Sequence, residues 1–232
     1  MTMIGVLGGM GPLATVDFMG KVIQLTDAEC DQQHLPMIVA NLPQIPDRSH
    51  AILTGDESPL AHLLDGIDLL NRNAVGLIAI PCNSSHHWYA QMQARSPAPL
   101  LHIAETCVAA VPSGVRRVAV LATRGSLASR FYQHTLASRD IEPVEPDDAM
   151  QQRIDHCIAD VKAGRLREAS VALTAILAAL ADDGVRAAIL GCTELPVAAQ
   201  HAVPTSMTLI DSTLELARAT VTYATERGWN RT

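Results

Sequence analysis

Two cysteines occupy equivalent places in the two halves of the chain, and thiols in such places can move protons. Cys82 follows an apolar run that begins at Leu77, and Cys192 follows one that begins at Ala188. Polar residues come next in both segments. The pattern predicts a buried parallel strand ending at a thiol beside a helix start, where open α/β sheets place their ligands. Two thiols that face one crevice could exchange protons with a bound molecule.

A lone cysteine at a strand end is most simply a small buried apolar residue. The matched pair favours chemistry instead, because helix starts lower the pKa of a thiol and make it reactive. The other cysteines are widely spaced and form no Cys-x-x-Cys pair, which argues against a disulfide framework or a zinc knuckle, and we expect no metal site. These three thiols are expected to be structural: Cys30, Cys107 and Cys157.

The first strand of the chain is also repeated. The run from Ile4 to Leu7, followed by a glycine loop, is echoed by the run from Val118 to Leu121, and both repeats are separated by about half of the 232 residues. The repeat predicts two similar flavodoxin-like, parallel-sheet α/β domains related by a pseudo-twofold axis, with the active site in the cleft between them. We place the first domain at residues 1–99 plus 211–232, completed by the C-terminal helix, and the second at residues 100–210.

Strands and helices alternate along the chain. Buried apolar runs predict strands at 4–7, 37–42, 76–80, 101, 118–121, 187–190 and 208–210. Helical spacing predicts helices at 12–26, 60–71, from 85, 103–111, from 126, 149–161, 168–181 and 212–225. The proline-rich segment from Pro43 to Arg48 is expected to be an irregular loop at the ligand edge of the sheet.

Composition excludes several functions. The formal net charge of −7, without a dense Lys/Arg stretch, gives no electrostatic footprint for nucleic acid or an anionic membrane. The N-terminus lacks the basic start and apolar core of a signal peptide, and no apolar run approaches the roughly 18 residues of a membrane span. We therefore expect a cytoplasmic protein whose partner is a small molecule.

The loop from Gly8 to Gly11 admits two interpretations. Its backbone N–H groups could hold a small anion at a helix start, or the loop could be a tight turn between strand and helix. The residues required for dinucleotide or nucleoside triphosphate binding are missing, so no such cofactor is expected.

Four segments in order resemble the aspartate racemase branch of the aspartate/glutamate racemase family. They are Leu7-Gly8-Gly9-Met10-Gly11-Pro12-Leu13-Ala14-Thr15, Asn41-Leu42-Pro43-Gln44-Ile45-Pro46-Asp47-Arg48, Pro81-Cys82-Asn83 and Gly191-Cys192-Thr193-Glu194. The match is spread over the whole chain. The family's fold of two facing α/β domains agrees with the internal repeat, and the resemblance also suggests a homodimer.

The resemblance implies a racemase without a cofactor, in which Cys82 and Cys192 flank the α-carbon of aspartate. One thiolate removes the α-proton and the opposite thiol donates one, because inversion requires removal on one face and delivery on the other. The two thiols should titrate as a coupled pair, which predicts a bell-shaped dependence of rate on pH.

A dicarboxylic amino acid also needs polar partners. Arg48 is our first choice for the distal carboxylate, because a guanidinium group pairs with a carboxylate through two hydrogen bonds. Lys162 is the second choice, by the resemblance of Val161-Lys162-Ala163-Gly164 to a family segment. The full set of expected substrate-binding residues is Met10, Gln44, Arg48, Asn83, Ser84, Thr123, Lys162 and Thr193.

One departure from the family and several alternatives stay open. The family commonly has Thr-Ala after Pro-Cys-Asn, whereas this chain has Ser84-Ser85, so substrate choice could differ. Glutamate or dual aspartate/glutamate activity is an alternative. Another is a non-catalytic protein that binds a dicarboxylate. A third is a hydrolase with Cys82 as nucleophile and His86 or His87 as base, although no orienting acid is evident. A decarboxylase that uses one cysteine is disfavoured by the pair.

Overall fold

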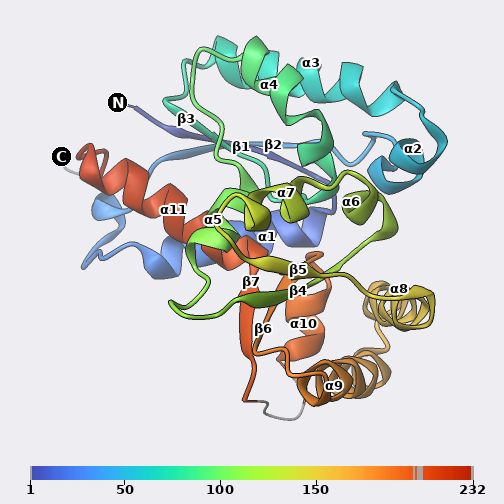
Figure 1. The fold of residues 1–232 in the computed structure, drawn as a ribbon. Coiled ribbons are helices and arrows are strands. Elements are labelled where there is room, and N and C mark those ends of the chain that lie inside the picture. The colour runs from blue at the N-terminus through green and yellow to red at the C-terminus, as the bar shows by residue number, and fades with distance from the viewer. Residues whose placement is uncertain (1, 201, 203–205, 231–232) are drawn as a thin grey trace.

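Two parallel β-sheets form the centre of the molecule, and the computed structural model describes residues 2–200, 202 and 206–230 (Figure 1). In the first sheet, β1 (Ile4–Gly8) lies between β2 (Met37–Asn41) and β3 (Leu77–Ala79). The second sheet has the order β5-β4-β6-β7, with β4 at Arg117–Ala122, β5 at Glu142–Val144, β6 at Ala187–Gly191 and β7 at Thr208–Asp211. All pairings are parallel. The predicted fold class is confirmed.

The sheets share one topology. A parallel bridge between Ile78 and Leu100 adds a short fourth member to the first sheet beside β3, in the place that β7 occupies beside β6. β3 and β6 are therefore equivalent strands, and Cys82 and Cys192 follow them at the same edge. Residues of β1 and β6 are buried throughout, as expected for parallel strands covered on both faces.

Helices cover the first sheet and are fixed by local sequence signals. Pro12 begins α1 (Pro12–Leu25), a position where proline costs no hydrogen bond. The other elements of this unit are a 3₁₀ turn at Asp31–Gln33, α2 (Arg48–Thr54), α3 (Ser58–Arg72), a 3₁₀ helix at Ser84–Trp88 and α4 (Tyr89–Arg95). Asp47 caps α2 by accepting a hydrogen bond from His50 N–H at 2.7 Å.

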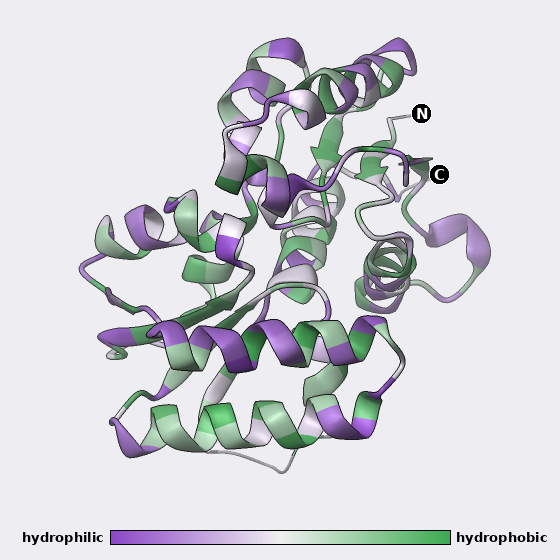
Figure 2. Ribbon diagram, turned by 90° about the vertical axis from the view of Figure 1, so that its right-hand side faces the viewer, coloured by the Kyte–Doolittle hydropathy of each residue, from purple (hydrophilic) through white to green (hydrophobic). Residues whose placement is uncertain are grey.

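The helices that follow Leu100 are α5 (Ile103–Ala109), α6 (Arg124–Ala128), α7 (Phe131–Ala137), α8 (Asp148–Lys162), α9 (Leu166–Asp182), α10 (Leu195–Ala199) and α11 (Ser212–Glu226). Figure 2 shows α8 and α9 side by side, with α9 the more apolar of the two. Leu173 and Ile176 of α9 pack with Ile154 of α8 in the core of this unit. Gly164, at a φ of +76°, makes the turn between these helices.

Two sequence expectations need correction. Arg48 does not lie in a loop but is the first residue of α2, because the Asp47 cap starts a helix immediately after the prolines. The single helix expected from residue 126 is two helices, α6 and α7, because Arg130 adopts a left-handed φ of +57° between them. Both features depend on single backbone positions that apolar periodicity does not report.

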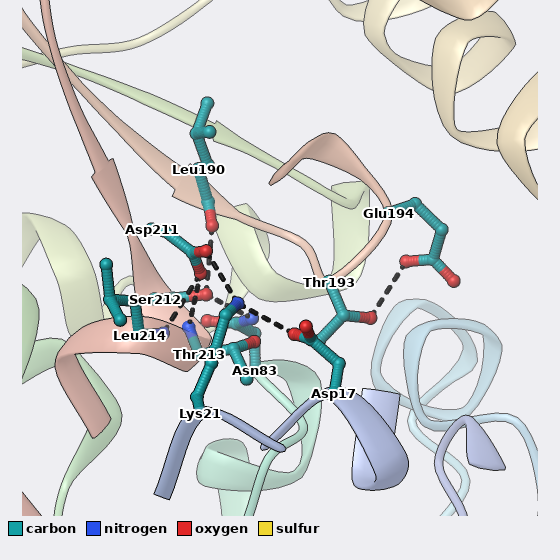
Figure 3. A network of polar contacts seen from close by, with 10 residues as sticks. All are labelled: Asp17, Lys21, Asn83, Leu190, Thr193, Glu194, Asp211, Ser212, Thr213 and Leu214. Carbon is teal, nitrogen blue, oxygen red and sulfur yellow. Dashed lines mark hydrogen bonds and ion pairs between the residues drawn. The ribbon is translucent and has the colours of Figure 1, made fainter. Parts of the chain in front are cut away.

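The C-terminal helix α11 packs against α1 of the first unit and against α5. Its first residue, Ser212, takes part in a buried hydrogen-bonded link between the two segments that contain the cysteines (Figure 3). The Asn83 amide donates to Ser212 Oγ at 3.1 Å, and Ser212 Oγ donates to the carbonyl of Leu190 in β6 at 2.9 Å. This link joins the residue after Cys82 to the strand that ends at Cys192. The predicted domain boundaries stay a prediction, to which the packing of α11 on α1 lends support.

A half-buried lysine reinforces the same region. Lys21 Nζ lies 2.7 Å from the carboxylates of both Asp17 and Asp211 (Figure 3). Asp211 also caps α11 by accepting from the N–H groups of Thr213 and Leu214. One carboxylate thus connects α1 to the start of α11.

In the part of the chain described above, the structure contains no helix both long and apolar enough to cross a membrane.

The substitution Ser212→Ala should destabilise the protein by about 1–3 kcal/mol, because it leaves the buried Asn83 amide and the Leu190 carbonyl without their partner. Chemical denaturation followed by circular dichroism measures the free energy of unfolding. The matched control is Ser138→Ala, which removes an exposed hydroxyl bonded to Thr135. Equal unfolding free energies for the two variants would show that the link contributes nothing.

Candidate functional site

The carboxyl ends of the two sheets enclose a cavity of about 140 Å³. Both Cys82 and Cys192 line it, one from each unit. Expected substrate-binding residues that also line it are Met10, Arg48, Asn83, Ser84, Thr123, Lys162 and Thr193. Gln44 does not: it lies in an exposed turn away from the cavity, because the turn before α2 directs it to solvent.

Cys82 follows β3 through Ile80 and Pro81 and is 5% exposed. Its carbonyl oxygen accepts two hydrogen bonds, from Ser85 Oγ at 2.7 Å and from the ring of His86, whose Nδ1 is 2.9 Å away. These contacts fix the backbone at the start of the 3₁₀ helix and thereby the direction of the thiol.

His86 serves the backbone in this arrangement. Its second ring nitrogen lies 3.4 Å from the carbonyl oxygen of Leu101, and burial lowers the pKa of His86 to about 3, so the ring is neutral at pH 7. His87 contacts the hydroxyl of Ser129 instead. These polar contacts of both rings engage groups other than the Cys82 thiol, which gives the hydrolase alternative no support.

Cys192 has a carboxylate partner. Its thiol lies 3.0 Å from Glu194 Oε2, and the hydroxyl of Thr193 donates to the same oxygen at 3.0 Å (Figure 3 shows the Thr193 contact). Lys162 Nζ is 3.9 Å from the other carboxylate oxygen. Burial, and next the charge of Glu194, raise the pKa of Cys192 well above its usual value. Cys192 therefore holds its proton at neutral pH.

Sequence reasoning gave Glu194 no role. It was visible only as the last residue of a motif, two positions after the thiol. The signal that could have found it is an acid close behind a cysteine at a helix start, since an acid there can face the same crevice. Its significance depends on the direction of its side chain, which the sequence does not report.

Arg48 is held in place by main-chain oxygens. Its guanidinium donates to the carbonyls of Ile45 at 3.1 Å, Pro46 at 3.0 Å and Met10 at 3.2 Å. Its Nε is buried without a hydrogen-bond partner among the described residues. A guanidinium that is fixed in this way and lines a cavity is suited to pair with an anionic oxygen.

The side chain of Asn83 makes structural contacts. Its carbonyl oxygen accepts from the hydroxyl of Tyr132 at 2.5 Å, while its nitrogen donates to Ser212. Tyr132 and Ser212 are both fully buried. Asn83 also lines the cavity, and its expected role in binding the substrate stays a prediction.

Hydroxyl groups from both units meet at the cavity. Ser84 Oγ lies 3.3 Å from Thr123 Oγ1 and 3.0 Å from Ser126 Oγ. Thr123 also caps α6 by accepting from the N–H of Ser126. Ser84 therefore joins the two units at the cavity wall, and its expected role in substrate binding stays a prediction.

The glycine loop is a tight turn. The N–H of Gly9 donates to the hydroxyl of Thr15 at 2.8 Å, so it is not free to bind an anion. Gly9 has a φ of +94°, and a Cβ there would lie 2.4 Å from the backbone nitrogen of Leu42, so only glycine fits. The close packing carries Met10 and Gly11 to the cavity.

Within residues 2–200, 202 and 206–230, no group of three or more His, Cys, Asp or Glu side chains is placed to hold a metal ion.

Two facing α/β units with one thiol from each in a shared cavity define a protein class suited to acid and base work at a single bound molecule. Residues 7–220 match the family described as Asp/Glu/Hydantoin racemase. The chain belongs to this family, and it is accordingly a racemase, an isomerase. The resemblance found in its motifs is confirmed.

Individual relatives agree with that assignment. The chain is 31% identical over 223 residues to the broad specificity amino-acid racemase RacX of Bacillus subtilis, covering 94% of this chain and 96% of RacX. It is 30% identical to the aspartate racemase of Picrophilus torridus, with a TM-score of 0.85 over 97% of this chain and 95% of that one. The glutamate racemase of Francisella tularensis, solved with D-glutamate, shares the fold at 17% identity, with a TM-score of 0.71 over 98% and 82% of the chains.

The substitution Glu194→Gln should lower the pKa of Cys192, because it keeps the shape of the side chain and removes the negative charge that opposes thiolate formation. Alkylation with iodoacetamide, followed at the Cys192 peptide by mass spectrometry across pH, should show a midpoint at lower pH than in the wild type. Glu226→Gln is the control, because Glu226 is exposed and lies outside the cavity. A midpoint that stays in place or rises would contradict the assigned effect of Glu194.

Proposed function

We propose that the chain interconverts L- and D-aspartate without a cofactor, by two-base proton exchange at the α-carbon. The observation that supports this most strongly is the pair of thiols, Cys82 and Cys192, at equivalent strand ends on one cavity. Inversion of a carbon centre needs a base on one face and an acid on the other. A pseudo-twofold fold supplies such a pair by symmetry.

The proposed step is balanced within the site. In one direction the Cys82 thiolate removes the α-proton and becomes a thiol, while the Cys192 thiol delivers its own proton to the opposite face and becomes a thiolate. The reverse direction exchanges the roles. The raised pKa of Cys192 suits the donor role in the resting enzyme.

Glu194 faces the thiol of Cys192 at 3.0 Å. When Cys192 acts as the base, Cys82 carries the proton, so the two thiols hold one proton between them in either direction. The carboxylate of Glu194 favours the protonated form of Cys192. Glu194 acts through that thiol and is a positioning residue in this proposal.

Substrate recognition rests on Arg48 and the hydroxyl cluster. The guanidinium of Arg48 suits the distal carboxylate of aspartate, and Lys162 adds a second cation to the lining of the cavity. Ser84, Thr123 and Thr193 line the same space, where negative charge grows on the α-carboxylate when the α-proton leaves. Thr123 and Thr193 would have to turn their hydroxyls from Ser126 and Glu194 to donate to that group. Preorganised donors of this kind take the place of an electron sink.

Aspartate is favoured over glutamate by the small volume of the cavity, but one methylene group separates such substrates only modestly. Dual activity therefore stays the second candidate, since a glutamate racemase shares the fold. A dicarboxylate-binding protein without turnover is the non-enzymatic alternative. A homodimer and a cytoplasmic location remain our predictions for the assembled protein.

The substitutions Cys82→Ser and Cys192→Ser should each reduce racemisation of aspartate by roughly 10²–10⁴-fold, because each removes one acid/base group. Chiral chromatography of L-aspartate and L-glutamate incubated with each variant measures the rate. Cys30→Ser is the matched control, because Cys30 is exposed and lies outside the cavity.

Full racemase activity in the Cys82→Ser or the Cys192→Ser variant would refute the two-base proposal. Binding of aspartate by the wild-type protein without any racemisation would favour the binding-protein alternative.

A further inference from the structure

A second cavity of about 550 Å³ adjoins the thiol cavity and has no role in the proposed racemisation of aspartate. The two cavities share four lining residues: Gly11, Lys162, Thr193 and Glu194. The second cavity lies between the start of α1, the end of α8 and α10. A molecule held between the thiols could therefore extend into it.

The wall of this second cavity is mostly apolar. Leu13 and Ala14 contribute from α1, Leu166 from the start of α9, and Val197 from α10. Leu13 is 85% exposed, so a large apolar side chain faces solvent at this cavity. Apolar surface left open beside a binding site gains free energy when an apolar group covers it.

Charge limits what can enter. The carboxylates of Asp17 and Glu194 lie in this wall, with Lys162 as its cation. Lys21 already pairs with Asp17 at 2.7 Å, and Lys162 lies 3.9 Å from Glu194. An anionic side chain would meet two carboxylates and an apolar surface, so the distal carboxylate of aspartate belongs at Arg48 and not here. A neutral apolar side chain fits without such repulsion.

Lys162 stands where the two cavities meet. Its side chain is 59% exposed and its nitrogen is 3.9 Å from Glu194, a long ion pair. Exposed pairs of this kind contribute little stability, so the side chain can turn aside at small cost. Rotation of the Lys162 side chain can therefore widen the passage between the two cavities.

We propose that the second cavity receives the side chains of neutral apolar amino acids longer than aspartate, such as methionine and leucine, while the thiols act on their α-carbon. The inference rests on the proposed racemase function and widens its substrate class. Under this arrangement one pair of thiols serves two groups of substrates. Short anionic side chains stay at Arg48, and long apolar side chains pass Lys162.

The test compares α-proton exchange of L-aspartate, L-methionine and L-leucine in D₂O by proton NMR. Val197→Trp and Leu13→Trp should fill the second cavity and lower kcat/KM for methionine and leucine by roughly 10-fold or more, the scale set by apolar side-chain contacts. Exchange of aspartate should stay within about twofold of wild type, because neither residue lines the thiol cavity. Val171→Trp is the control, since Val171 is 65% exposed on α9 and lines neither cavity.

The Leu13→Trp variant is expected to fold normally, because a side chain this exposed can be enlarged without repacking the core. Thermal unfolding checks that both tryptophan variants are folded. Exchange of aspartate alone by the wild type would overturn this inference and leave the proposed function standing. Unchanged methionine rates in both filled variants would also overturn it. Exchange of methionine but not aspartate would support the cavity assignment and refute the aspartate assignment. Exchange of none of the three would overturn the proposed function and this inference with it.

Discussion

The buried hydrogen-bond link through Ser212 is the constraint on which the site depends. Asn83 follows one cysteine directly, and Leu190 precedes the other by two residues, so the link through Ser212 fixes one thiol-bearing segment relative to the other. Its polar groups are shielded from water, and each loses a partner if the units separate. Two acid/base groups can work on one carbon only if the distance between them is fixed. In the proposed reaction Cys82 and Cys192 are such a pair, and the hydroxyl of Ser212 at the start of α11 links the segments that carry them.

The symmetry of the fold is broken at the thiols themselves. Both follow equivalent strands, yet the segments after them differ. A 3₁₀ helix follows Cys82, and Ser85 and His86 of that helix bond to the carbonyl oxygen of Cys82. At the second site, the carboxylate of Glu194 faces the thiol of Cys192. Glu194 favours the protonated form of Cys192. Identical thiols that were both ionised would repel each other and leave no proton to donate.

The sequence predicted the parts that depend on local patterns. Apolar runs located β3 and β6, and the polar residues behind them placed both thiols at a ligand edge. The separate motifs converged on one cavity because parallel strands of one topology end on the same side.

Side-chain direction and long-range partners were beyond such reasoning. Gln44 belongs to the same motif as Arg48, but one faces solvent and the other lines the cavity. The side chain of Asn83 bonds to Ser212, 129 residues away in the chain, and no local pattern reports that contact. Glu194 was passed over because its importance comes from where its carboxylate points. No periodicity or spacing encodes these features, which arise only when the units pack together.

The most direct test of the two-base account is the isotope content of both enantiomers early in the reaction. L-aspartate would be incubated with the enzyme in D₂O, stopped at a few per cent conversion, separated into enantiomers and examined by mass spectrometry. Two thiols on opposite faces predict solvent deuterium at the α-carbon of the D-aspartate formed and almost none in the remaining L-aspartate. Retention of the original proton in the product would contradict the account, because it would require a single group to carry the same proton from one face to the other.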